Sequence, residues 1–169
     1  MDRRGKLVVA ATAVVAAVLV VASMGGLGLL PTGEYERTSV TAVDDADGAT
    51  LATVDVRVAD TFQKRYTGLS DTDSLGPNEG MLFVHDEAGE HAYVMRDMAF
   101  PLDIVFVAAD GTITTIHHAP LPSEGTGDSE LTRYRGEGKY VLEVAYGYTN
   151  RTGIETGDRV EIAGEWGTS

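Results

Sequence analysis

One stretch of this chain, from Gly80 to Val107, places an aspartate at the start of an apolar run and constrains the fold more than any other feature. Asp103 directly follows Pro101-Leu102 and directly precedes the run Ile104-Val105-Phe106-Val107. A run of this kind indicates a buried strand. A charge beside it is costly to bury unless it is paired or hydrogen-bonded. The sequence therefore predicts a buried strand and a polar partner for Asp103.

Short strands separated by frequent turn signals describe the chain after Pro31. Val54, Val56 and Val58 alternate with polar residues, which is the period of a strand. Asp110-Gly111 is the strongest hairpin signal. We expect strands at residues 36–43, 51–59, 80–85, 92–98, 102–108, 112–117, 140–146 and 159–163. The pattern predicts an all-β fold with minor α content: a single β-sandwich or barrel-like domain.

One or two short helices accompany these strands. Asp60 is expected to cap a helix over residues 61–66, which Gly68 would end. Residues 149–155 contain one helical turn in this interpretation. Residues 120–138 are polar and rich in glycine, which indicates a long surface loop.

The N-terminus has the pattern of a membrane segment. Three basic residues lie within the first six positions, and an uncharged run then extends over residues 7–30. At about 1.5 Å per residue, a helix of that length crosses a hydrocarbon core of roughly 30 Å. The basic flank places the N-terminus in the cytoplasm and the remainder outside. We therefore expect a signal-anchor in residues 1–30, a linker at 31–35 and an extracytoplasmic β-domain over 36–169.

A cleaved signal peptide is the alternative, and it would give a secreted protein instead of a single-pass membrane protein. Ala22-Ser23-Met24 matches the usual small-residue cleavage site poorly, although Gly25 and Gly26 leave cleavage open. The chain contains no cysteine. Anchoring through a lipidated N-terminal cysteine is therefore excluded, as are disulfides and thiolate chemistry.

The charge of the chain is strongly negative. It has 26 acidic and 13 basic residues, and only three of the basic residues are lysines. Repulsion among so many like charges opposes compaction. Molar salt reduces this repulsion, because it shortens the screening length to about 3 Å. The composition therefore indicates a halophilic protein. It also argues against nucleic acid as a partner, because no basic stripe exists to neutralise phosphates.

Six motifs occur in a recognisable order along the globular part. They are Arg65-Tyr66-Thr67-Gly68-Leu69, Gly80-Met81-Leu82-Phe83, Tyr93-Val94-Met95-Arg96, Pro101-Leu102-Asp103-Ile104-Val105-Phe106, Val141-Leu142-Glu143 and Gly157-Asp158. Together they resemble the domain-of-unknown-function family 192, whose members are small, β-rich and often exported or membrane-anchored. The likeness covers about residues 50–162. It implies a fold, and it makes Gly68, Leu69, Gly80, Met81, Phe83, Met95, Pro101, Phe106, Gly157 and Asp158 structural motif residues.

The chain also departs from the family pattern. The resemblance implies a tryptophan where Val94 stands and an asparagine–threonine pair where Asp97 and Met98 stand. It also implies a cysteine shortly after the proline of the Pro120–Pro122 region, and this chain has none. A function that depends on that tryptophan or cysteine is not expected here.

Four charged residues form the candidate polar site: Arg65, Arg96, Asp103 and Glu143. Strand periodicity puts Glu143 on the same face as Val141. A carboxylate on an apolar strand is best neutralised by an arginine, whose planar guanidinium can satisfy both of its oxygens. These residues are thus either structural ion pairs or the lining of a pocket for a small anionic or sugar-like ligand.

The remaining motifs carry less chemistry. The adjacent histidines His117 and His118 point to opposite faces of a strand and do not form a simple chelate; we expect no metal site and no cofactor. Asn150 begins a glycosylation sequon. The sequence favours a ligand-binding or structural accessory module of the cell envelope, whose ligand or partner protein stays open. The alternative is a hydrolase-like enzyme that acts on a saccharide or envelope component through Asp103 and Glu143.

Overall fold

The computed structural model describes residues 33–166 of the chain. The predicted membrane helix over residues 7–30 lies outside these residues, as does the start of the linker. Within residues 33–166, no helix is long and apolar enough to cross a membrane. The described residues 33–166 belong to one compact unit.

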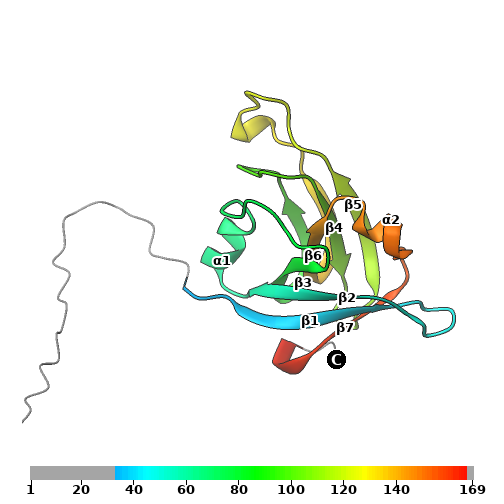
Figure 1. The fold of residues 1–169 in the computed structure, drawn as a ribbon. Coiled ribbons are helices and arrows are strands. Elements are labelled where there is room, and N and C mark those ends of the chain that lie inside the picture. The colour runs from blue at the N-terminus through cyan, green and yellow to red at the C-terminus, as the bar shows by residue number, and fades with distance from the viewer. Residues whose placement is uncertain (1–32, 167–169) are drawn as a thin grey trace, which may run out of the picture. The chain divides into compact units, whose positions relative to one another are not determined.

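Seven strands form a single sheet (Figure 1). Along the sheet their order is β5-β4-β6-β3-β2-β1-β7. The strands are β1 (Glu36–Val43), β2 (Thr50–Ala59), β3 (Glu79–Tyr93), β4 (Leu102–Val107), β5 (Ile113–Ala119), β6 (Tyr134–Ala145) and β7 (Arg159–Ile162). All neighbouring strands are antiparallel except β2 and β3, which are parallel. The all-β fold predicted from the sequence is therefore confirmed.

The sheet curves into a half-barrel whose two edge strands meet at one end. Thr112, just before β5, forms a bridge with Arg159 at the start of β7. The backbone N–H of Ile113 donates to the carbonyl oxygen of Asp158 at 2.8 Å. Because one sheet bends round instead of two sheets packing face to face, the barrel-like form of the prediction is the one observed.

Two strands are longer than the sequence predicts. The strand expected at residues 80–85 continues to Tyr93 as β3, with an irregularity between Val84 and Gly89. The strand expected at residues 92–98 is wrong beyond Tyr93, because residues 94–98 form a loop. The second half of β3 pairs with a part of β6 that falls inside the predicted surface loop, as in the pair Tyr93 and Tyr134. Charged residues and glycines fill this stretch, so no apolar alternation marks it in the sequence.

Two short helices join the sheet, as predicted. Helix α1 (Phe62–Thr67) begins one residue later than expected, because Thr61 is its N-cap and accepts from the Lys64 backbone N–H at 3.3 Å. Asp60 instead pairs with the Lys64 ammonium at 2.9 Å. Helix α2 is Tyr148–Thr152. Two 3-10 turns, η1 (Asp128–Glu130) and η2 (Gly164–Trp166), complete the described elements.

The two faces of the sheet bury separate apolar clusters. On β6, Leu142 and Val144 belong to one cluster and Val141 belongs to the other. Tyr148 of α2 packs in the cluster of Leu142. Helix α1 lies over the opposite face, beside Phe83 of the Val141 cluster. Each face therefore carries its own helix and its own polar group, as described next.

Candidate functional site

Glu143 is the buried carboxyl group on the α1 face of the sheet. Only 5% of the residue is exposed, and its strand neighbours Met81 and Ile104 are fully buried. Among the described residues, its carboxyl group accepts no hydrogen bond and forms no ion pair. Burial raises the pKa of Glu143 from 4.5 to about 8. The group is therefore protonated and neutral near pH 7.

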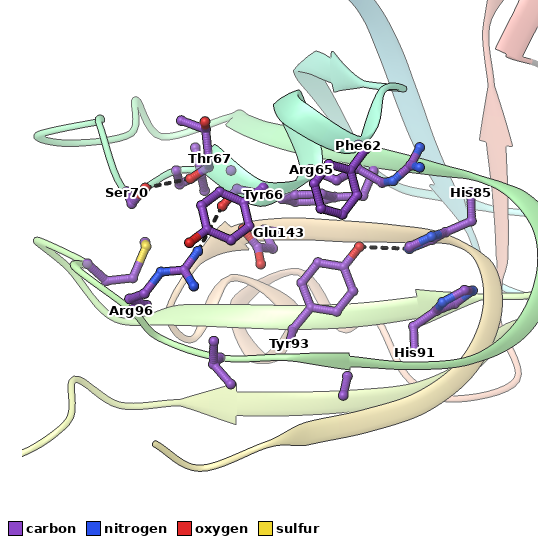
Figure 2. A pocket seen from close by; sticks show the side chains of 16 residues that line it. Phe62, Arg65, Tyr66, Thr67, Ser70, His85, His91, Tyr93, Arg96 and Glu143 are labelled. Atoms are coloured by element: carbon purple, nitrogen blue, oxygen red, sulfur yellow. Dashed lines mark hydrogen bonds between the residues drawn. The ribbon is translucent and has the colours of Figure 1, made fainter. Parts of the chain in front are cut away.

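A cavity of about 410 Å³ opens beside this carboxyl group (Figure 2). Helix α1 provides one wall with Arg65 and Tyr66, and the end of β3 provides another with Tyr93. Arg96 comes from the loop after β3. A volume in this range suits a small ligand.

The two arginines of the cavity bind backbone carbonyl groups instead of carboxylates. Arg65 Nη1 donates to the carbonyl oxygens of Asp60 at 2.8 Å and Val84 at 2.7 Å. Arg96 Nη2 donates to the carbonyl oxygen of Tyr66 at 3.1 Å, and its guanidinium lies 4.2 Å from the centre of that ring. Neither arginine forms an ion pair within residues 33–166. The predicted arginine–carboxylate pairs are therefore wrong, whereas the predicted polar pocket does contain three of the four residues.

A group of polar side chains, not expected from the sequence, forms the far side of the cavity. The Tyr93 hydroxyl shares a hydrogen bond of 2.9 Å with His85 Nε2, and the rings of His85 and His91 stack 3.5 Å apart. Burial, with help from His91 and Arg65, lowers the pKa of His85 to about 4. Burial also raises the pKa of Tyr93. The alternation of Phe83 and His85 along β3 was the available signal for this placement.

One further atom in this wall is a buried polar atom with no partner. His91 Nε2 makes no hydrogen bond to any described residue, although the atom is shielded from solvent. Buried polar groups are normally hydrogen-bonded. The Glu143 carboxyl group and His91 Nε2 are thus two polar groups at one cavity that have no hydrogen bond to a described residue.

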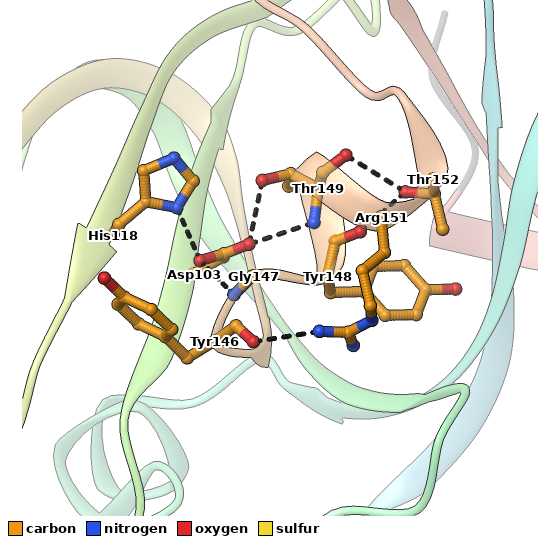
Figure 3. A network of polar contacts seen from close by, with 8 residues as sticks. All are labelled: Asp103, His118, Tyr146, Gly147, Tyr148, Thr149, Arg151 and Thr152. Carbon is orange, nitrogen blue, oxygen red and sulfur yellow. Dashed lines mark hydrogen bonds and ion pairs between the residues drawn. The ribbon is translucent and has the colours of Figure 1, made fainter.

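Asp103 lies in a different place, against α2, and is completely buried (Figure 3). Its Oδ1 accepts from His118 Nδ1 at 2.7 Å and from the Gly147 backbone N–H at 2.9 Å. Its Oδ2 accepts from the backbone N–H and the hydroxyl of Thr149, at 2.9 and 2.8 Å. Burial alone would raise the pKa of Asp103, but these four hydrogen bonds together hold it below its ordinary value.

The polar partner predicted for Asp103 is present, but it is not an arginine, as the ion-pair interpretation would require. A histidine at the end of β5 and the first turn of α2 take its place, since they supply four donors to one carboxylate. Asp103 therefore joins two elements of the fold. Its carboxylate is fully engaged by these donors and faces no cavity with Glu143.

The residues carried by the family resemblance lie mainly in the core around Glu143. Seven of them are buried: Gly68, Leu69, Gly80, Met81, Phe83, Met95 and Phe106. Gly68 ends α1 with a φ of 54°, and Gly157 has a φ of 103° in the turn before β7. The carbonyl oxygen of Pro101 accepts from the Tyr146 backbone N–H at 3.2 Å, and Asp158 Oδ2 accepts from the Glu155 backbone N–H at 2.8 Å.

Two other sequence features take simple positions. Asn150 is exposed on α2, and the hydroxyl of Thr152 in its sequon donates to the carbonyl oxygen of Tyr148 at 2.8 Å. Within residues 33–166, no group of three histidines or carboxylates is arranged to hold a metal ion.

The order of these elements and of the motif residues agrees with a known family. A family model described as an uncharacterised ACR, DUF192, matches residues 42–162. The chain belongs to the DUF192 family. The assignment covers the sheet from the end of β1 to β7, including both the cavity and the Asp103 network.

Two solved structures are similar to this DUF192 domain. One is a proposed transcription regulator from Sinorhizobium meliloti 1021, with 33% identity and a TM-score of 0.67 over 77% of this chain and 98% of that chain. The other is a protein of unknown function from Novosphingobium aromaticivorans, with 28% identity and a TM-score of 0.64 over 79% and 91% of the two chains. No curated protein is significantly similar to the chain.

Three of the departures that the resemblance implies, Val94, Asp97 and Met98, lie in the loop after β3, beside the cavity. Val94 and Met98 both line it. Asp97 lies between them in sequence with a φ of 54°, a left-handed conformation that asparagine and aspartate adopt more readily than most residues. The substitution at Asp97 thus preserves the backbone, whereas valine and methionine change the lining of the pocket.

Proposed function

We propose that this DUF192 domain is a small-ligand-binding module of the cell envelope, and that the cavity beside Glu143 is its binding site. The single observation that carries the proposal is the unpartnered, 95%-buried carboxyl group of Glu143 on a cavity of about 410 Å³. A buried polar group without a partner costs about 1–3 kcal/mol. A bound ligand that hydrogen-bonds to it recovers that energy.

The hydrolase-like alternative has less support. It requires two carboxyl groups that face the same scissile bond, some 5–10 Å apart. Glu143 pairs across the sheet with Ile104, the residue after Asp103, so the two acidic side chains point to opposite faces. We therefore favour binding over paired-carboxylate catalysis.

Anchoring in the membrane through residues 7–30 completes the proposal, with the β-domain outside the cell. Its support is the basic start followed by the long uncharged run. Cell fractionation of the whole chain and of a variant that lacks residues 1–30 tests it. The whole chain is expected in the membrane pellet and the truncated chain in the supernatant. A truncated chain that still pellets would contradict the anchor.

Nucleic acid is not part of the proposed function. The net charge of −13 repels the phosphates of nucleic acid. One similar structure is that of a proposed transcription regulator, but this similarity does not offset the negative charge of the present chain. Small molecules remain the ligands that the cavity suits.

A thermal-shift panel of sugars, organic acids, nucleotides and divalent metals tests the binding function. The full-length protein is compared with Glu143→Leu, which removes the polar group, and with Glu161→Leu, which changes an exposed glutamate of β7, as the matched control. A compound that raises the melting temperature of wild type and Glu161→Leu, but not of Glu143→Leu, supports the site. If no compound in the panel shifts the wild-type protein, the proposal fails.

A further inference from the structure

The two arginines of the cavity have no ion-pair partner among residues 33–166. Each donates to backbone carbonyl oxygens, and neither forms an ion pair among the described residues. Arg65 uses Nη1 for both of its hydrogen bonds, which leaves the donors on Nε and Nη2 for another partner. Arg135 is the one described arginine with an ion pair, so what distinguishes Arg65 and Arg96 is that both line the cavity beside Glu143.

The other titratable side chains that line the cavity do not offset this positive charge. Glu143 is the one acidic residue among the described lining residues, and burial keeps its carboxyl group protonated. His85 is neutral for the same reason, with its pKa lowered to about 4. His91 stacks on the His85 ring, and Tyr93 holds its proton. The cavity therefore has a net positive charge near neutral pH, which attracts an anion.

The same cavity offers several neutral hydrogen-bonding groups at its base. A protonated carboxyl group has one O–H donor and further acceptor capacity, so Glu143 can pair with a hydroxyl group of a ligand in both directions. Tyr93 and His91 add polar atoms nearby, one of them unpartnered. A simple inorganic anion would leave these groups unsatisfied.

Two aromatic residues of α1 line the cavity side by side. Phe62 stacks on Tyr66 with ring centres 6.2 Å apart, and the guanidinium of Arg96 covers the Tyr66 ring at 4.2 Å. Phe62 is 77% exposed. The Tyr66 ring thus contacts both Phe62 and Arg96, while Phe62 offers an open apolar surface to the ring of a ligand.

On the basis of the proposed binding function, we propose that the ligand is a hydroxylated organic acid of monosaccharide size, such as a sugar acid. Arg96 and Arg65 hold its carboxylate, and Glu143 and Tyr93 bind its hydroxyl groups. Guanidinium groups bind carboxylates through paired N–H donors. Neutral sugars lack the group that the arginines would hold, and simple carboxylates lack the groups that Glu143 and Tyr93 would bind.

Isothermal titration of the full-length protein with three probes tests this class. The probes are D-glucuronate, D-glucose, which lacks the carboxylate, and propionate, which lacks the hydroxyl groups. We expect glucuronate to bind at least tenfold more tightly than either of the other two. The Arg96→Gln variant is expected to weaken glucuronate binding at least tenfold, with Arg96→Lys intermediate. Arg133→Gln, which changes an exposed arginine outside the cavity, is expected to bind like wild type.

Three results would overturn the inference. Glucose binding as tightly as glucuronate would remove the role of the carboxylate, while the proposed binding function would stand. Propionate binding as tightly would remove the role of the hydroxyl groups. If none of the three probes binds but another compound of the thermal-shift panel does so through Glu143, the ligand class is wrong and the binding site is still correct.

Discussion

Asp103 and Glu143 lie on adjacent strands one position out of register, so their side chains point to opposite faces of one sheet. Asp103 is ionised, because four donors surround its two oxygens. Glu143 is protonated, because burial without a partner raises its pKa. The two carboxyl groups have separate roles: one holds the fold together and the other lines the cavity.

Asp103→Asn is expected to destabilise the protein by about 2–4 kcal/mol. An amide has only one acceptor oxygen, so its NH₂ group would face N–H or O–H donors that the carboxylate now satisfies. Hydrogen bonds to a charged group contribute about 1.5–3 kcal/mol each. Urea unfolding measures the change, and Asp73→Asn in an exposed loop is the control. Because the folded pKa of Asp103 lies below its ordinary 3.8, the difference should be complete above pH 4 and shrink in stronger acid. Equal stabilities at pH 7 would contradict the structural role.

Glu143→Gln is expected to change how stability depends on pH. The folded pKa of about 8 lies above the ordinary 4.5, so the unfolded chain ionises first, and the wild type loses stability as the pH rises from 4.5 to about 8. The loss relative to Glu143→Gln should reach on the order of 3–5 kcal/mol. Unfolding by urea at a series of pH values measures it. The ionisation of His85 contributes equally to the stability of both proteins, so it does not affect the difference between them. Parallel curves would show that Glu143 ionises normally.

Gly80→Ala is expected to destabilise the sheet next to the cavity. A Cβ at this position would lie 2.5 Å from the carbonyl oxygen of Glu143, so the strands β3 and β6 would have to separate. Overpacking of this kind costs about 1–3 kcal/mol. Gly89→Ala on the same strand is the matched control, since nothing lies within 4 Å of its added carbon. Equal melting temperatures for the two variants would contradict the close approach.

Stability is expected to increase with salt concentration. The chain carries a net charge of −13, and molar salt shortens the screening distance to about 3 Å, which removes most of the repulsion between surface carboxylates. Thermal unfolding followed by circular dichroism, from millimolar to molar potassium chloride, measures the effect. A melting temperature that does not change with salt would contradict the halophilic interpretation.

The sequence predicted local structure well where one face of a strand is apolar. Val54, Val56 and Val58 are all buried, and Glu143 shares the face of Val141 as its alternation indicated. Such patterns depend only on the pleat of a strand.

The sequence could not predict partners that come from distant parts of the chain. His118 and Thr149 reach Asp103 from 15 and 46 residues away, and their hydroxyl and imidazole groups have many other uses in proteins. The second half of β3 was also missed, because its pairing with β6 depends on backbone hydrogen bonds between polar and glycine-rich segments.

The most direct test of the central claim, that the cavity beside Glu143 binds a small hydroxylated acid, is a map of the binding site by NMR. Backbone amide shifts of the ¹⁵N-labelled full-length protein are followed during titration with D-glucuronate. We expect saturable shifts at Tyr66, Tyr93 and Glu143, and none at Gly147 and Thr149 on the opposite face. Shifts confined to the Asp103 network, or an unchanged spectrum, would contradict it.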